Sequence, residues 1–243
     1  MIKLNQENEW WIMDYIISDI HGEYDLFITL LKKIEFNKND KMIICGDIID
    51  KGAHSIKLLK FIRKQENMIF LMGNHEYEFL KYYNKIMEEV ADEFDSNQVL
   101  SEINDYFPNE TYKLSWNDLY WLEECGYFYE TDDFICVHAG VKLNKYKEVE
   151  NLNDTDINYF VYDRKLKEET CVINNSKCVF YGHTPTSYLC NDSKILTYKR
   201  EGSNTNTIKD YYKIHLDCGV YLSGVLGCIC IDSCECVYVN KYK

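Results

Sequence analysis

Five short apolar runs in the sequence each end abruptly in residues that commonly bind metal ions. The endings are Asp19 and His21 after YIIS, Asp47 and Asp50 after MIIC, Asn74 and His75 after IFLM, His138 after FICV, and His183 after VFY. Loops at the carboxyl ends of parallel strands open into one crevice, so side chains at five such ends can converge. We therefore interpret these endings as one metal site.

The order of the apolar runs predicts an α/β fold. Strands are predicted at Tyr15–Ser18, Met42–Cys45 and Met68–Met72, with helices from about Glu23 to Ile34 and from about His54 to Lys64. This repeated βαβ pattern implies a largely parallel sheet flanked by helices. Later runs at Phe134–Val137 and Cys178–Tyr181, the segment IHLDCGV and a C-terminal hairpin indicate a second set of strands. The predicted fold class is a two-sheet β-sandwich flanked by helices.

No linker or repeat divides the chain, which has only two prolines and eleven glycines. We predict a single domain over residues 1–243, with residues 1–12 peripheral. The polar segment near 78–124 reads as a helical insertion over one sheet edge, and Ser115 is a plausible helix cap within it.

Composition narrows the classes of function. The formal net charge of −13 disfavours binding to extended nucleic acid, although metal ions can reverse the field inside a small pocket. The N-terminus lacks the apolar core of a signal peptide, and no run approaches the roughly 18 apolar residues of a membrane span. We expect a cytoplasmic protein without a membrane partner.

The eleven cysteines are too sparse for a disulfide scaffold and several lie inside apolar runs, so we expect reduced, buried thiols. The cluster Cys228, Cys230, Cys234 and Cys236 admits a soft-metal site. Its period-two alternation, with Asp232 and Ser233 as turn residues, favours a β-hairpin instead.

The spacing of the metal-binding residues suits two ions rather than one. Asp19 and His21 are two residues apart, so in extended backbone both point to the same side. Asp47 can offer one oxygen to each of two ions. The amide and imidazole groups that would complete the second ion are Asn74, His138 and His183. Mixed oxygen and nitrogen ligands favour Mn, Fe, Zn or Co over a soft metal.

The motifs SDIHG, GDIIDKG, GNHE, VHAG and YGHT, in this order from about residue 13 to the C-terminus, resemble the calcineurin-like metallophosphoesterases. The combination of GNHE, GDxxDKG and a late GHTP is similar to the phosphoprotein phosphatase branch, which includes bacterial and phage Ser/Thr phosphatases and symmetrical dinucleoside tetraphosphatases. The resemblance implies a four-layer α/β/β/α fold.

The resemblance also implies roles for individual residues. The first metal would be bound by Asp19, His21 and Asp47, and the second by Asp47, Asn74, His138 and His183. His75 would protonate the leaving oxygen while Asp50 orients its ring, and the nucleophile would be a metal-bound hydroxide. Two divalent ions are expected, manganese foremost, with Fe, Zn, Co or Ni as alternatives.

Substrate phosphate is expected to contact Lys51, Arg164 and Asn74. Lys51 stands where the family usually has arginine and lacks the bidentate fork, which affects affinity rather than chemistry. Arg164 resembles the family's later phosphate-binding arginine, although a surface salt bridge is the alternative. His54 and His215 match no ligand motif, and Asp217 is expected to be structural or to lie behind the ligands.

The leading functional hypothesis is a Ser/Thr phosphatase-like phosphomonoesterase that acts on a phosphoprotein or a small phosphate ester. Symmetrical hydrolysis of diadenosine tetraphosphate is the main alternative. A catalytically weak phosphate-binding module and an enzyme acting on short nucleic-acid ends are further alternatives. A purine would need an aromatic slot and a phosphopeptide an open groove, which we expect from segments 78–124 and 141–164.

Overall fold

The computed structural model describes residues 13–89, 95–203 and 205–242, so the predicted peripheral segment 1–12 lies outside the described residues. The strands are β1 (Asp14–Ile17), β2 (Lys41–Cys45), β3 (Met68–Leu71), β4 (Phe128–Glu130), β5 (Phe134–Val137), β6 (Cys178–Tyr181), β7 (Leu196–Lys199), β8 (Tyr211–His215), β9 (Val225–Cys230) and β10 (Cys236–Asn240). The α-helices are α1 (Tyr24–Lys33), α2 (Ser55–Arg63), α3 (Asn74–Glu89), α4 (Ser96–Asn104), α5 (Trp116–Glu123), α6 (Ile157–Tyr162) and α7 (Val220–Ser223). Short 3-10 helices lie at Leu152–Asp154, Thr186–Tyr188 and Ile208–Asp210.

The strands form two five-stranded sheets, in the orders β10-β9-β1-β2-β3 and β4-β5-β6-β8-β7. The first sheet is parallel through β1, β2 and β3, as the βαβ pattern predicts, and antiparallel at β9 and β10. In the second sheet β5, β6 and β8 are parallel, and the outer strands β4 and β7 are antiparallel to them. Both sheets are therefore mixed: the first is parallel on one side, and the second is parallel at its centre.

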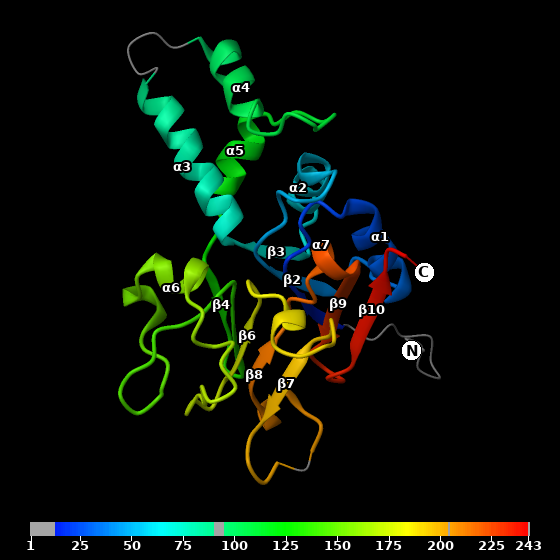
Figure 1. Cartoon of the computed structure of the whole chain (residues 1–243), viewed down its shortest axis with the longest axis vertical. Coiled ribbons are helices and arrows are strands. Elements are labelled where there is room, and N and C mark those ends of the chain that lie inside the picture. The colour runs from blue at the N-terminus through cyan, green and yellow to red at the C-terminus, as the bar shows by residue number, and fades with distance from the viewer. Residues whose placement is uncertain (1–12, 90–94, 204, 243) are drawn as a thin grey trace.

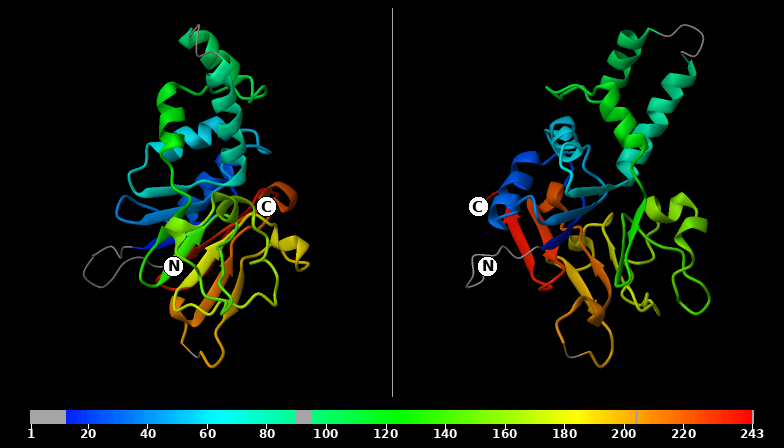
Figure 2. Two further views of the ribbon diagram at one scale, coloured as in Figure 1. Left: turned by 90° about the vertical axis from the view of Figure 1, so that its left-hand side faces the viewer. Right: turned by 180° about the vertical axis from the view of Figure 1, so that it is seen from behind.

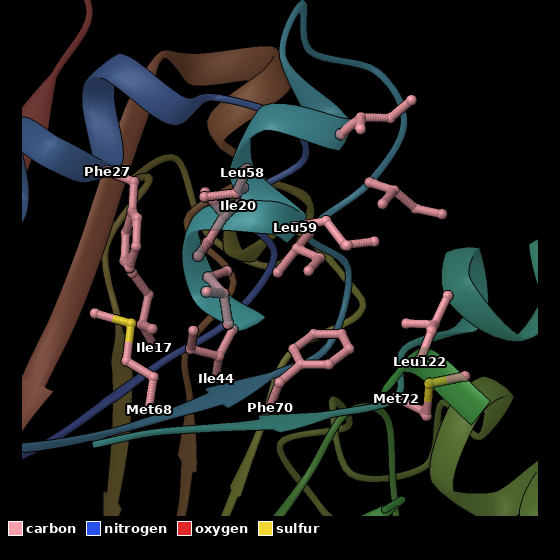
Figure 3. Packing of buried hydrophobic residues seen from close by; sticks show 14 of the residues in the cluster. Ile17, Ile20, Phe27, Ile44, Leu58, Leu59, Met68, Phe70, Met72 and Leu122 are labelled. Atoms are coloured by element: carbon pink, nitrogen blue, oxygen red, sulfur yellow. The ribbon is translucent and has the colours of Figure 1, made fainter. Parts of the chain in front are cut away.

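Both faces of the first sheet are buried, and successive side chains alternate between them. Ile17, Ile44 and Phe70 face α1 and α2, where they pack with residues such as Phe27 and Leu59 (Figure 3). Their neighbours Ile16, Ile43 and Leu71 face the second sheet and pack against Phe134 and Phe180. Period-two alternation with both faces apolar explains why these strands read as continuous hydrophobic runs.

The outer face of the second sheet is covered by the segment that contains α6. Ile135 and Val137 of β5 pack with Phe160 and Val161 of that helix. The two sheets thus lie between helices on either side, as the views in Figures 1 and 2 show. The predicted class, a two-sheet α/β fold flanked by helices, is confirmed.

The polar segment after β3 is helical and projects from the edge of the first sheet as α3, α4 and α5 (Figure 1). Its first helix begins at Asn74, earlier than the predicted start near 78, so the GNHE motif forms the first turn of α3. Ser115 is the N-cap residue of α5 as expected, and the Asp118 carboxylate in the first turn accepts hydrogen bonds from its backbone N–H and its hydroxyl. None of the helices in the described ranges has the length and apolarity needed to cross a membrane.

The cysteine-rich C-terminus forms the predicted hairpin. Strands β9 and β10 are antiparallel, with Cys228 opposite Val237 and Cys236 opposite Ile229. All eleven cysteines are free, and Cys45, Cys136 and Cys178 are buried. These thiols pack as small apolar side chains.

The sequence reading missed the edge strands β4 and β7. Neither is fully buried: β4 shows two half-buried residues followed by an exposed one, and β7 alternates half-buried with exposed residues. Edge strands are short and only partly covered, so they lack the apolar run that identifies a central strand.

Candidate metal centre

All the predicted metal ligands lie just after parallel strands, five of them in loops and Asn74 as the first residue of α3. Asp19 and His21 follow β1, Asp47 follows β2 and Asn74 follows β3. From the second sheet, His138 follows β5 and His183 follows β6. The carboxyl ends of both sheets therefore meet at one place, as the strand endings predicted.

Asp47 lies at the centre of this cluster. Two groups of ligand atoms lie close enough together to hold a metal ion: Asp47 with His21 and His75, and Asp47 with His138 and His183. One Asp47 oxygen lies 3.7 Å from His21 Nε2, and the other lies 3.5 Å from His138 Nε2. One carboxylate is thus shared by two sets of nitrogen donors, the arrangement of a two-metal site.

Backbone carbonyls determine which ring nitrogens of His21 and His138 face the cluster. His21 Nδ1 lies 3.0 Å from the Ile49 carbonyl oxygen, and His138 Nδ1 lies 3.0 Å from that of Cys45. A nitrogen that faces a carbonyl oxygen must carry the proton, so each Nε2 presents a lone pair. Burial, followed by the charge of Lys51, holds the pKa of His21 well below its usual value, so this ring is neutral.

The second group brings acceptor atoms together. Asn74 Oδ1 lies 3.0 Å from His138 Nε2 and 2.9 Å from His183 Nδ1. The His138 Nε2 lone pair and the Asn74 oxygen are both acceptors and cannot hydrogen-bond to each other, so a cation would relieve their repulsion. Burial lowers the pKa of His183 to about 2, and the neighbouring His138 and Arg164 act in the same direction. The residues present therefore fit a bound metal ion.

Asp19 lies beside these groups rather than inside them. Its carboxylate accepts a hydrogen bond from the His183 backbone N–H at 3.1 Å. A Cβ added to Gly182 would lie 2.1 Å from the Asp19 carboxylate, and one added to Gly73 would lie 2.1 Å from that of Asp47. Only glycine leaves room for the two carboxylates at these positions.

The backbone of the site is strained. Six of the nine non-glycine residues with positive φ in the described part of the chain belong to the predicted site: Asp19, His21, Asp47, Asp50, Lys51 and His183. Such conformations cost roughly 1–3 kcal/mol each and persist where the surrounding structure imposes them. The sharp bends after the strands turn these side chains toward one another.

His75 and Asp50 form the predicted pair. His75 Nδ1 lies 2.7 Å from Asp50 Oδ2, and His75 Nε2 lies 3.9 Å from Asp47. Burial alone would lower the pKa of His75, but the hydrogen bond to Asp50 and the charge of Asp47 outweigh it and raise the pKa. Tyr106, which follows α4, donates a 3.5 Å hydrogen bond to the same Asp50 oxygen.

Glu76 is a residue that our sequence reasoning missed. Its buried carboxylate accepts hydrogen bonds from the backbone N–H groups of Asp47, Ile48, Ile49 and Gly73, at 2.8–3.0 Å. It thereby holds the loop that carries Asp47 against the start of α3. The signal was available, because Glu76 is the last letter of the GNHE motif.

Lys51 and Arg164 line one cavity of about 330 Å³ together with His21 and His183. Lys51 Nζ lies 2.8 Å from His21 Nε2. Arg164 follows α6 and donates a 3.1 Å hydrogen bond to Thr184 Oγ1, next to His183. Arg164 therefore lies at the border of the centre rather than in a salt bridge on a surface helix.

The three residues left out of the predicted site occupy different places. His54 precedes α2 and lines another cavity, and His215 is buried against the Tyr181 ring. Asp217 borders the site: it lines the same cavity as Lys51. Burial and then the charge of Asp19 raise the pKa of its carboxyl well above the usual range.

The fold and the centre together define an α/β protein in which two sheets gather histidine and aspartate donors around one shared carboxylate. The chain belongs to the calcineurin-like phosphoesterase family, whose sequence model matches residues 15–224. The resemblance drawn from the motifs is thereby confirmed. Members of this family use divalent metal ions, in keeping with the donor groups around Asp47.

The alignments with curated relatives cover only part of this chain and only part of each relative. The chain is 42% identical over 89 residues to a symmetrical bis(5'-nucleosyl)-tetraphosphatase of Wigglesworthia glossinidia brevipalpis. The aligned segment covers 36% of this chain and 32% of that protein. A protein of the same name from Buchnera aphidicola subsp. Acyrthosiphon pisum (strain 5A) is 29% identical over 132 residues, 52% of this chain and 44% of the relative. The matches therefore span about a third to a half of these relatives.

Solved structures share the fold. A protein provisionally assigned as a diadenosine tetraphosphatase superposes with a TM-score of 0.67 at 14% identity, covering 94% of this chain and 93% of the other. A metallophosphoesterase from Sphaerobacter thermophilus gives a TM-score of 0.55 at 15% identity, covering 94% and 87%. At these identities the likeness is evidence for the fold alone.

Proposed function

We propose that this chain is a metal-dependent phosphohydrolase whose reaction takes place at the centre around Asp47. The observation that carries the proposal is the position of the Asp47 carboxylate, one oxygen of which faces His21 while the other faces His138, with the His75–Asp50 pair beside it. Asp19, His21 and Asp47 would hold one divalent ion. Asp47, Asn74, His138 and His183 would hold the other.

Two bound ions would supply Lewis acidity and activate a water molecule for attack on phosphorus. Side chains of the protein would bind the substrate phosphate and supply a proton to the leaving group. Lys51 and Arg164, on the cavity wall, would bind phosphate oxygens. The amide of Asn74, whose Oδ1 lies 2.9 Å from His183 Nδ1, is the third proposed phosphate contact. Manganese is our first candidate because the donors are carboxylate, amide and imidazole rather than thiolate.

In this proposal His75 is the proton donor. Its Nε2 faces Asp47, and its Nδ1 is held by Asp50. A carboxylate partner stabilises the charged ring, so a proton is available where the leaving oxygen departs. Asp50 is a positioning residue, and Tyr106 supports it.

For the substrate we place dinucleoside tetraphosphates ahead of phosphoproteins, which reverses the order of the sequence-based hypotheses. The relatives matched by sequence carry the name of symmetrical tetraphosphatases, whereas the neighbours named protein tyrosine phosphatases share only the fold, at 17–18% identity. We retain the cytoplasm as the proposed location.

The leaving group separates the two substrates experimentally. A phosphate oxygen of a nucleotide leaves as a stable anion, since the second pKa of a phosphate group is about 6, whereas the alkoxide of threonine needs a proton to leave. We expect His75→Ala to lower kcat on a phosphothreonine peptide by roughly 100-fold or more. The loss on diadenosine tetraphosphate should be clearly smaller.

The measurement is steady-state kinetics on both substrates, in protein stripped of metal and reloaded with manganese. His54→Ala is the matched control, because His54 lies outside the centre. Equal losses of kcat on the two substrates would show that His75 is not the general acid. If the wild-type protein binds two equivalents of metal yet cleaves neither substrate, the chain is a phosphate-binding module instead.

A further inference from the structure

The cavity beside the metal centre has two chemically different sides. Lys51 and Arg164 provide positive charge close to His21 and His183. The other side is formed by Tyr188, Tyr221 and Leu222. A ligand that fits this cavity therefore carries negative charge at one end and a flat or apolar group at the other.

The apolar side is unusually exposed. Tyr188, Tyr221 and Leu222 are 70%, 56% and 53% exposed, and they are three of only ten large hydrophobic side chains exposed in the described part of the chain. Among the described residues, neither tyrosine ring makes a ring contact or a hydroxyl hydrogen bond, although most aromatic rings of this chain pack against another ring. Two free aromatic faces at one cavity mark a binding surface.

The two tyrosines lie on segments that are tied together. Tyr188 ends the 3-10 helix Thr186–Tyr188, and Tyr221 lies in α7. The Thr186 N–H donates to the Asp217 carbonyl at 2.8 Å, and the Asp217 carboxylate accepts from the Gly219 N–H at 2.7 Å.

Gly219 also touches the other segment. A Cβ on Gly219, which has φ +67°, would lie 2.9 Å from Pro185 Cβ, so the segments before Tyr188 and Tyr221 pack directly on each other. The backbone segments that carry the two tyrosines are thus held together before any ligand arrives, which reduces the entropy lost on binding.

We propose that Tyr188 and Tyr221 form the binding site for a nucleobase whose phosphates extend past Lys51 and Arg164 to the centre at Asp47. Bases stack on aromatic side chains whatever their sequence identity, and cationic groups bind the phosphates. A volume of about 330 Å³ lies at the lower end of the range for small-molecule pockets, so it suits one nucleoside rather than a whole dinucleotide.

This site rests on the proposed function and deepens it. The aromatic residues come from segments 185–188 and 219–222, not from segments 78–124 and 141–164 where we expected them. A phosphoserine or phosphothreonine residue offers no planar group at a fixed distance from its phosphate, so the cavity favours nucleotides over these two phosphopeptides.

The test compares two substrates that share phosphoanhydride bonds: diadenosine tetraphosphate, which has bases, and inorganic tripolyphosphate, which has none. We expect Tyr188→Ala and Tyr221→Ala each to lower the ratio of kcat/KM for the first to kcat/KM for the second by roughly tenfold. Tyr188→Phe and Tyr221→Phe should restore most of the ratio, because they keep the rings. Tyr146→Ala, which removes an equally exposed tyrosine outside the cavity, is the control.

Binding of adenosine, followed by saturation-transfer NMR on the protein loaded with diamagnetic zinc, tests the site independently of catalysis. We expect signal with wild type and Tyr146→Ala, and a loss with Tyr188→Ala. An unchanged substrate ratio, or equal losses on both substrates, would overturn the base site. If the wild-type protein binds adenosine at these tyrosines but hydrolyses neither substrate, the proposed reaction is wrong and the base site is retained. If it binds no adenosine, the base site is wrong whatever the activity.

Discussion

The histidine side chains of this chain illustrate how local surroundings determine the function of one residue type. Burial keeps His21 and His183 neutral, so their lone pairs are available to a cation. His75 differs because Asp50 and Asp47 overcome the effect of burial and raise its pKa. His215 is also buried, but it belongs to neither group of ligand atoms and stacks on Tyr181 at a ring distance of 4.4 Å.

His215 gives a prediction about stability and pH. Burial, its largest influence, lowers its pKa from 6.5 to about 4, so between these values the unfolded chain binds a proton that the folded chain does not. The contribution of His215 to the free energy of unfolding is complete above pH 6.5. As pH falls toward 4, this free energy decreases by about 3 kcal/mol.

The measurement is urea unfolding in chelator at several pH values for wild type and His215→Phe, which keeps the stacked ring. The wild-type free energy of unfolding should fall more steeply than that of the variant between pH 6.5 and 4. Parallel curves would show that His215 does not contribute, and His54→Phe serves as the control.

At the scale of elements, two central strands hold the loop that carries Arg164. Lys213 of β8 is fully buried, and its Nζ donates to the carbonyl oxygens of Leu166 and Glu168 at 2.8 and 2.7 Å. The Tyr181 hydroxyl of β6 donates to the same Leu166 oxygen at 2.8 Å. Burial lowers the pKa of Lys213, and the bonds to the loop compensate its lost hydration.

We predict that Lys213→Met raises KM roughly tenfold with little change in kcat, because Arg164 would lose its fixed position while the metal ligands keep theirs. Steady-state kinetics on diadenosine tetraphosphate tests this, after circular dichroism shows that the variant is folded. Lys209→Met removes an exposed lysine paired with Asp133 and should leave KM unchanged. A fall in kcat with constant KM would contradict the positioning role.

At the scale of the whole molecule, the candidate metal centre joins the two sheets. Asp47 comes from the first sheet and His138 from the second, and the His138 ring bonds the Cys45 carbonyl across the interface. Likewise the His183 backbone bonds Asp19. An ion bound by donors from both sheets therefore opposes their separation on unfolding.

Metal removal should consequently destabilise the protein. At a free ion concentration about 100 times Kd, binding adds about 2.7 kcal/mol, which corresponds to a rise in Tm of roughly 5–10 °C for a chain of this size. Thermal unfolding with manganese and with chelator measures the shift. Asp47→Asn should abolish this Tm shift, whereas the control Asp132→Asn should retain it. An unchanged Tm of the wild type in saturating manganese would contradict the binding of an ion by donors from both sheets.

The sequence by itself determined the central strands, the fold class and the candidate metal ligands, because each ligand directly follows an apolar run and strand ends converge whatever the details of packing. Tertiary structure alone decided three other features. Remote carbonyls at Ile49 and Cys45 select the free nitrogens of His21 and His138. The buried Glu76 carboxylate gathers N–H groups from a distant loop.

The edge strands and the two tyrosines of the cavity could not be predicted from the sequence either. Periodicity records burial along one segment, and β4 and β7 are only partly buried. Tyr188 and Tyr221 are 33 residues apart along the chain and line the same cavity because the segments that carry them pack together at Gly219 and Pro185. Contacts between distant segments depend on how the elements pack, and no local pattern encodes them.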